Sequence, residues 1–147
     1  MAYFDSSYIA KCYLNEPGAG EVRALAATFQ GLFSCELGRL EFFSVLQRHL
    51  REGKLTAEQV QQVEAHFDED ESAGVWLWLP VTSSLLRQAG TELRRVPATV
   101  FVRASDALHL VCAKNHGFTE VHTNDRHMLA AASSFGVIGK NVIPAGT

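Results

Sequence analysis

Residues 2–13 read AYFDSSYIAKCY, and this stretch decides the fold. It begins as a short apolar run that ends in an acid, Asp5, and then changes to apolar residues at helical spacing between Tyr8 and Tyr13. Two serines lie at the change, where residues that favour a helix start are expected. We therefore predict a strand that passes directly into a helix, with Asp5 at the junction.

The same alternation of strand and helix patterns continues along the chain. Short apolar runs predict further strands at 32–35, 75–80 and 118–123, with a possible fifth at 137–143. Helical patterns occupy 22–29, 36–52, 56–67, 82–95, 105–117 and the residues after Asn124. The alternation implies an α/β fold, with a mostly parallel central sheet of four to five strands flanked by helices.

Three of these elements carry sharper expectations. Thr56 opens the pattern of a capping box, and Ser105 is expected to cap the helix that follows it. The strand at 75–80 is continuously apolar, which is typical of a strand covered on both faces of a sheet. We therefore expect Trp76 and Trp78 to lie in the core rather than to serve as exposed stacking platforms.

The composition fits one compact domain over residues 1–147, because 47% of the residues are hydrophobic and can build a single core. No apolar stretch approaches the roughly 20 residues of a membrane span, and Asp5 interrupts any secretory signal. The three cysteines form no C-x-x-C pair, which fits reduced thiols. We expect a cytoplasmic protein.

The charge balance argues against a broadly basic surface that coats nucleic acid. Thirteen Lys and Arg against sixteen Asp and Glu give a formal net charge of −3. Several of the acids form a run from Glu64 to Glu71, which we expect to be the solvated end of a helix. A polyanionic partner would therefore need a local binding site.

Four acids outside that run are candidates for chemistry. Asp5 and Asp125 each lie where a strand passes into a helix, at the sheet edge where α/β proteins bind ligands. Asp106 opens a helix, and Glu41 lies among apolar residues in mid-helix, where a charge needs a partner. Each also has an ordinary interpretation: the aspartates as helix caps or first-turn residues, and Glu41 as part of an exposed polar stripe.

If these carboxylates converge, their mutual repulsion would raise their pKa values unless a cation neutralised them. An all-oxygen set favours a hard divalent ion, Mg²⁺ or Mn²⁺, of the kind that supports chemistry on phosphates. Zinc is not expected, because the six histidines form no H-E-x-x-H motif and lie near no cysteine pair. For each histidine we expect a surface or core position, with His109, one turn from Asp106, the least settled.

Four blocks of sequence, in order, resemble one family. They are YFDSSYIAKCY from Tyr3, Ser34 with Glu41 on the following helix, RASDALHL from Arg103, and TND from Thr123. Together they are similar to PIN-domain ribonucleases, and more narrowly to the VapC-type toxins of prokaryotic toxin–antitoxin pairs. The resemblance covers essentially the whole chain and implies a PIN-like three-layer sandwich.

The resemblance also implies an activity, hydrolysis of phosphodiester bonds in tRNA or rRNA by a Mg²⁺- or Mn²⁺-dependent endoribonuclease. The family's acidic quartet, its metal ligands and catalytic residues, maps onto Asp5, Glu41, Asp106 and Asp125. Ser7 and Thr123 match hydroxyl positions that support the site in relatives. Members are commonly homodimers, and a cognate VapB-like antitoxin blocks the groove.

Basic residues outside the acidic run are candidates for contacts with RNA phosphates. They are Arg39, Arg48, Arg51, Arg94, Arg95 and Arg103. For each of them, a place on a solvated charged face is the ordinary alternative.

Other functions stay open at the level of sequence. Phosphotransfer through Asp5 is one, although Ser7 stands where aspartate-nucleophile phosphatases carry a second aspartate. An inactive PIN-like module that binds RNA or a partner without cutting is another, and the intact acidic quartet argues against it. Cysteine hydrolase chemistry at Cys35 or Cys112 has no local support, and glycine-rich phosphate loops are absent from the sequence.

Overall fold

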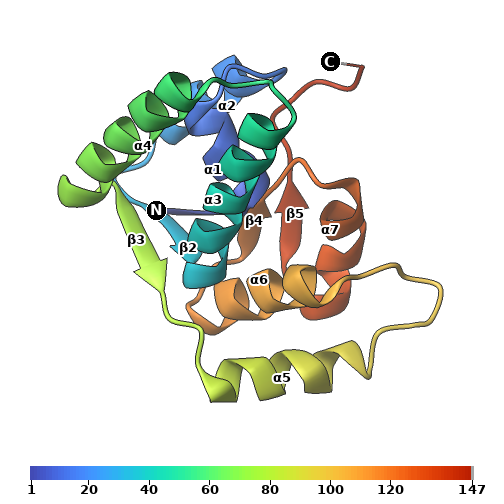
Figure 1. The fold of residues 1–147 in the computed structure, drawn as a ribbon. Helices are drawn as coiled ribbons and strands as arrows, with labels where there is room; N and C mark the ends of the chain where they lie inside the picture. The colour runs from blue at the N-terminus through green and yellow to red at the C-terminus, as the bar shows by residue number, and fades with distance from the viewer. Residues whose placement is uncertain (147) are drawn as a thin grey trace.

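The computed structural model describes residues 1–146, in which five parallel strands form one sheet (Figure 1). The strands are β1 (Ala2–Phe4), β2 (Leu32–Cys35), β3 (Trp76–Leu79), β4 (Glu120–His122) and β5 (Ile138–Lys140). Their order across the sheet is β3-β2-β1-β4-β5, and every neighbouring pair is parallel. The predicted α/β class with a parallel sheet of four to five strands is confirmed.

Helices cover both faces of this sheet. Those described in residues 1–146 are α1 (Ser6–Tyr13), α2 (Ala19–Ala26), α3 (Glu36–Arg51), α4 (Ala57–Ser72), α5 (Ser83–Leu93), α6 (Ala104–Asn115) and α7 (Arg126–Ala131), with a 3₁₀ helix at Ala132–Phe135. Helices α1 to α4 share one hydrophobic core with the sheet, and α5 to α7 share another. The arrangement is the expected three-layer sandwich. None of these helices has the length and apolarity that a bilayer crossing requires.

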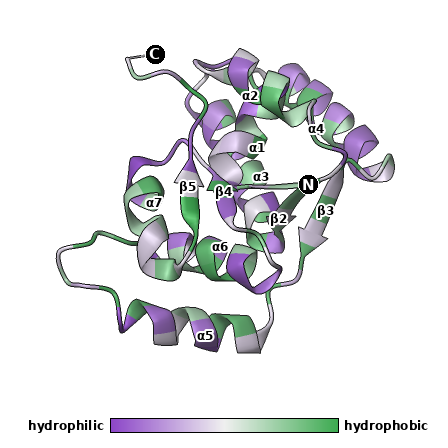
Figure 2. Cartoon of the chain, turned by 180° about the vertical axis from the view of Figure 1, so that it is seen from behind, coloured by the Kyte–Doolittle hydropathy of each residue, from purple (hydrophilic) through white to green (hydrophobic). Residues whose placement is uncertain are grey.

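The central strand β1 contributes to both cores. Tyr3 packs with α5 to α7, and its neighbour Phe4 packs with α1 to α4, because successive side chains of a strand point to opposite faces. Both side chains are fully buried. The outer helices differ, since α4 and α5 show hydrophilic and hydrophobic stretches in alternation, as expected of helices with one face in solvent (Figure 2).

The apolar run at 75–80 forms a strand, but the expectation that it is covered on both faces is wrong. Strand β3 lies at the edge of the sheet and pairs only with β2 among the described strands. Leu77 is accordingly 43% exposed. Trp76 is buried as expected and stacks on the partly buried Trp78, with ring centroids 5.5 Å apart.

Two expectations about helix starts had different outcomes. The capping box is confirmed, because Thr56 and Gln59 exchange hydrogen bonds between side chain and backbone. Ser105 does not cap its helix, since α6 begins one residue earlier and Arg103 is the flanking residue. The carboxylate of Asp106 reaches back to accept the backbone N–H of Arg103 at 3.0 Å, and so supplies the cap from inside the helix.

Strands β1 and β4 end side by side, which decides where the site lies. The backbone N–H of Asp5 donates to the carbonyl oxygen of His122 at 3.1 Å, so the turn after β1 meets the turn after β4. Asp5 then begins α1, and Asp125 begins α7. Two of the four candidate acids are therefore neighbours in space, although 120 positions separate them in the sequence.

Candidate active site

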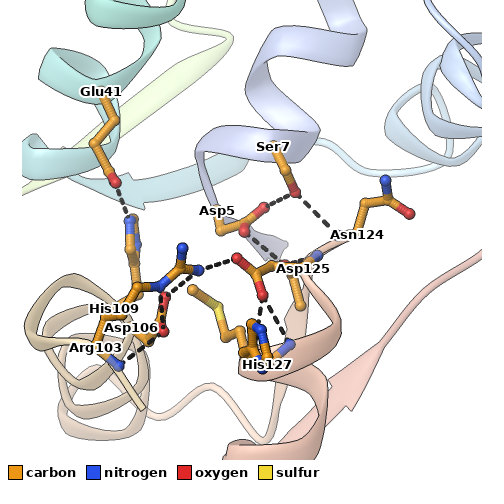
Figure 3. Close-up of polar contacts among 11 residues, drawn as sticks. Asp5, Ser7, Glu41, Arg103, Asp106, His109, Asn124, Asp125 and His127 are labelled. Carbon is orange, nitrogen blue, oxygen red and sulfur yellow. Dashed lines mark hydrogen bonds and ion pairs between the residues drawn. The ribbon is translucent and has the colours of Figure 1, made fainter. Parts of the chain in front are cut away.

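A cleft of about 550 Å³ opens at the carboxyl ends of the central strands. All four acids predicted from the sequence line it, namely Asp5, Glu41, Asp106 and Asp125. They come from four different parts of the chain: the ends of β1 and β4, the middle of α3 and the first turn of α6 (Figure 3). The fold thus brings together the set of carboxylates that sequence reasoning singled out.

Asp5 is held in the cleft floor by donors on both sides. Its side chain is almost fully buried and accepts the hydroxyl of Ser7 at 2.6 Å, the hydroxyl of Thr123 at 2.5 Å and the backbone N–H of Tyr8 at 3.1 Å. Burial raises the pKa of Asp5, while His109 and these hydrogen bonds act in the opposite direction. These hydrogen bonds therefore fix the orientation of the carboxylate, and a cation would stabilise its buried negative charge.

The two predicted supporting hydroxyls also connect the turns that carry the acids. Thr123 Oγ1 accepts the backbone N–H of Asp125 at 2.9 Å while it donates to Asp5. Ser7 Oγ accepts the backbone N–H of Asn124 at 2.9 Å while it donates to Asp5 as well (Figure 3). Each hydroxyl thus fixes the start of α1 to the β4–α7 turn through the same carboxylate.

Asp106 and Asp125 share a single cationic side chain, that of Arg103. The guanidinium donates to both oxygens of Asp106, with Nε at 3.1 Å from Oδ2 and Nη2 at 3.3 Å from Oδ1. Its Nη2 also contacts Oδ2 of Asp125. Burial by itself would raise the pKa of Asp125, but hydrogen bonds from the backbone N–H groups of His127 and Met128 and from Arg103 hold it below its ordinary value.

Glu41 has the partner that its mid-helix position requires, and the partner is His109 on α6. The ring Nε2 lies 2.6 Å from Glu41 Oε1, and the other ring nitrogen lies 2.8 Å from the hydroxyl of Tyr3 and 3.5 Å from Cys35 Sγ. Burial opposes the charged imidazole, but its contacts with Cys35 and Glu41 raise the pKa of His109 well above its ordinary value. His109 is a core histidine, as one of the sequence interpretations held, and its pairing with Glu41 was missed.

A glycine lets α3 approach α6 closely enough for this contact. A Cβ atom added at Gly38 would clash with the hydroxyl of Ser34 and lie 3.1 Å from Cε1 of His109. Gly38 lies one turn before Glu41 on α3, so this close approach of the two helices adjoins the Glu41–His109 contact. The signal in the sequence was a glycine inside an otherwise regular helical pattern.

The donor set fits a hard divalent cation, although three of the four carboxylates are paired with basic side chains. Within residues 1–146, no three acidic, histidine or cysteine side chains are grouped as ligands of one ion. The reason is visible in the site: Arg103 pairs with Asp106 and Asp125, and His109 pairs with Glu41. Two carboxylates that converge on one guanidinium also present oxygens at the same place to a metal ion, and all-oxygen ligation suits Mg²⁺ or Mn²⁺.

The six arginines proposed for RNA contacts divide into two groups. Arg48 and Arg103 line the cleft, and three basic side chains that sequence reasoning missed, Lys11, His49 and Lys54, line it with them. The others do not line it, and three have partners elsewhere: Arg39 pairs with Glu71, Arg51 with Gln47 and Arg95 with Glu92, while Arg94 follows the end of α5.

The acidic run from Glu64 to Glu71 is more than a solvated helix end. Asp70 accepts the hydroxyl of Tyr13 at 2.6 Å. Glu71 accepts Arg39 Nε at 2.6 Å and the indole N–H of Trp78 at 2.6 Å. The last turn of α4 is thus fastened to α1, α3 and β3, because two of its acids face inward to polar groups on these elements.

Known proteins resemble this chain in sequence pattern and in fold. The sequence pattern of the PIN domain family matches residues 2–133. No curated protein matches the sequence. Among solved structures, VapC20 of Mycobacterium tuberculosis, described as a toxin that cleaves the sarcin-ricin loop, is similar in fold. Its TM-score is 0.70 at 18% sequence identity, over 89% of this chain and 95% of that one.

Proposed function

Because the chain belongs to the PIN domain family, we propose that it is a metal-dependent endoribonuclease and the toxin of a type II toxin–antitoxin pair. One observation carries the proposal: four acids from four separate elements line one cleft at the carboxyl edge of a parallel sheet. The fold likeness to VapC20, described as a toxin that cleaves the sarcin-ricin loop, supports the same activity.

In this proposal the carboxylates hold one or two divalent ions. A bound Mg²⁺ or Mn²⁺ would supply a water of lowered pKa and positive charge beside the scissile phosphate. Asp5, Asp106 and Asp125 are the proposed ligands, with Glu41 at the far side of the cleft to bind a second ion or orient its water. Ser7 and Thr123 keep the Asp5 carboxylate in one orientation, as their hydrogen bonds indicate.

The substrate class follows from the rest of the cleft. Arg48 and Lys54 line it beside the acids and offer positive charge to a phosphate backbone, Lys54 while it also pairs with Glu52 at 3.0 Å. Looped or structured RNA, such as tRNA or rRNA, is the proposed substrate. A VapB-like antitoxin that covers the cleft, a homodimeric assembly and a cytoplasmic location complete the proposal.

The first test is RNA cleavage by the purified chain. We expect cleavage of tRNA or of an RNA hairpin with a sarcin-ricin-type loop in Mg²⁺ or Mn²⁺, and none in excess EDTA. Asp5→Asn and Asp106→Asn should each lower the rate on the order of 100-fold or more, because each removes negative charge from the proposed cation site. Glu41→Gln should also impair cleavage.

A matched control separates this effect from a general change of charge. Asp68 is an exposed acid on α4, outside the cleft, so Asp68→Asn changes the net charge equally and should cleave at the parental rate. Full activity of Asp106→Asn in a folded protein would falsify the proposed centre. RNA binding without cleavage by the unaltered chain would favour the inactive module instead.

A further inference from the structure

Arg103 holds the carboxylate oxygens that a divalent ion would need. Asp106 has both of its oxygens engaged, Oδ1 by the guanidinium and Oδ2 by the guanidinium and the backbone N–H of Arg103. In Asp125, Oδ1 accepts the backbone N–H groups of His127 and Met128 at the start of α7. Its other oxygen, Oδ2, is the one that Arg103 contacts.

A metal ion and the guanidinium therefore compete for the same atoms. Oδ1 of Asp125 is committed to the helix start, so a metal ligand from this residue has to be Oδ2. Two positive groups at that oxygen would also repel each other in a partly buried site. Binding of the ion thus requires the guanidinium to leave.

The side chain of Arg103 is built so that it can leave without loss of the fold. It is 49% exposed, whereas the side chain of Asp106 is 3% exposed. The hydrogen bond that caps α6 runs from the backbone N–H of Arg103 to Asp106, and it does not depend on where the guanidinium lies. A rotation of one surface side chain is enough to uncover both carboxylates.

We propose that the Arg103 side chain is an internal counter-ion that occupies the cation position between Asp106 and Asp125 and is displaced when a divalent ion binds. This inference rests on the proposed metal centre and adds a regulatory step to it. Metal binding has to break the contacts of Arg103, so the free energy of these contacts is subtracted from the free energy of metal binding. Metal affinity in this chain is therefore lower than the four acids alone would give.

The experiment compares Mn²⁺ binding by the unaltered chain, Arg103→Gln and Arg48→Gln, with free Mn²⁺ measured by electron paramagnetic resonance. Arg103→Gln should bind Mn²⁺ about tenfold more tightly, the scale of losing charge-assisted hydrogen bonds. Arg48 lines the same cleft, and within residues 1–146 it forms no ion pair with a carboxylate. Arg48→Gln removes the same charge and should tighten binding far less.

A second measurement follows the arginine itself. The Nε–H signal of Arg103 in a nitrogen-15 correlation spectrum, assigned by its loss in Arg103→Gln, should shift when Mg²⁺ is added. Arg103→Lys keeps the charge but loses the planar guanidinium, so its Mn²⁺ affinity should lie between those of the unaltered chain and Arg103→Gln. Thermal denaturation confirms that each variant is folded.

The outcomes separate this inference from the proposed function. Equal Mn²⁺ affinity of Arg103→Gln and the unaltered chain, or equal tightening by Arg103→Gln and Arg48→Gln, overturns the counter-ion role alone. If Asp106→Asn binds Mn²⁺ as well as the unaltered chain, the metal centre itself is overturned, and the counter-ion role falls with it.

Discussion

At the scale of the residue, the acids of the cleft serve the fold and the site at once. Asp5 caps α1, Asp125 caps α7, and Asp106 accepts the backbone N–H that precedes α6. The ordinary interpretation of these aspartates as caps is correct, and it does not compete with the functional one. A cap fixes one oxygen to the backbone and so orients the other toward the cleft.

Thr123 offers the sharpest test of how this orientation is maintained. We expect Thr123→Val to lower the RNA cleavage rate by about 10- to 100-fold, the range for partners that orient metal ligands. Valine keeps the shape of the side chain but removes the donor to Asp5 and the acceptor for the backbone N–H of Asp125. The measurement is the initial rate at saturating Mg²⁺.

The conservative variant provides the control for Thr123. Thr123→Ser retains the hydroxyl and should restore most of the rate, although it loses the methyl group at this fully buried position. If Thr123→Val cleaves RNA as fast as Thr123→Ser, the hydroxyl has no role in positioning Asp5.

Sequence reasoning found the acids because their positions depend on local patterns. Asp5 and Asp125 follow apolar runs, and a cap at a strand end is visible without a structure. The partners were not visible, because Arg103 reaches Asp125 across 22 positions and His109 reaches Glu41 across 68. Such contacts depend on how helices are packed, which a single sequence does not encode in any short motif.

At the scale of the element, the last turn of α4 shows how an acidic run can be structural. Glu71 receives hydrogen bonds from Arg39 on α3 and from Trp78 on β3. The hydrogen bonds from Arg39 are the largest cause of the lowered pKa of Glu71. One glutamate thus joins two helices and an edge strand.

This lowered pKa predicts a pH-dependent stability. A carboxylate with a lower pKa in the folded state stabilises the fold above its unfolded value of about 4.3, and the contribution is lost as the pH falls through the folded value. Glu71→Gln should therefore cost about 1 kcal/mol or less at pH 7, since the pair is partly exposed, and less than that at pH 3, where more of the carboxylate is protonated. Urea denaturation at both pH values measures the difference.

Glu69, two positions before Glu71 in the sequence, supplies the control for this prediction. Glu69 is exposed on the same helix, so Glu69→Gln should leave the free energy of unfolding almost unchanged at either pH. A cost of Glu71→Gln that is the same at pH 3 and pH 7 would show that the ionised carboxylate contributes nothing.

The elements themselves were largely predictable, and their arrangement was less so. Strand and helix positions follow from hydrophobic periodicity, which is local, and all five expected strands form. The order of the strands depends on which crossover each helix makes. The continuously apolar run at 75–80 predicts a strand covered on both faces, but β3 lies at the edge of the sheet and Leu77 is 43% exposed.

At the scale of the whole molecule, a net charge of −3 is compatible with an RNA substrate, because basic side chains stand beside the acids of the cleft. Arg48 and Lys54 line the cleft, whereas part of the acidic run is occupied by contacts with Tyr13, Arg39 and Trp78. The average charge of the chain therefore says little about the charge that a ligand meets in the cleft.

Salt dependence of RNA binding tests this distribution of charge. In an Asp106→Asn background, which is expected to leave RNA uncut, Arg48→Gln and Lys54→Gln should each weaken binding. Each should also reduce the slope of log affinity against log salt concentration by about 0.7, the value for one phosphate contact on a single strand. Fluorescence anisotropy over a range of KCl concentrations gives the slopes.

Arg95 is the control for the cleft cations. It follows α5, does not line the cleft, and pairs with Glu92. Arg95→Gln should leave the slope unchanged. A slope that falls equally for Arg95→Gln and Arg48→Gln would mean that RNA spreads over the surface instead of following the cleft.

The central place of the N-terminal strand has a consequence for synthesis. On the ribosome β1 is made before its partner β4, and the hydroxyl of Thr123 that holds Asp5 emerges more than a hundred residues after β1. Until then Asp5 lacks its hydrogen bond from Thr123, and Asp106 and Asp125 are not yet in place beside it. A growing chain therefore carries no assembled cleft until β4 and the start of α7 have been made.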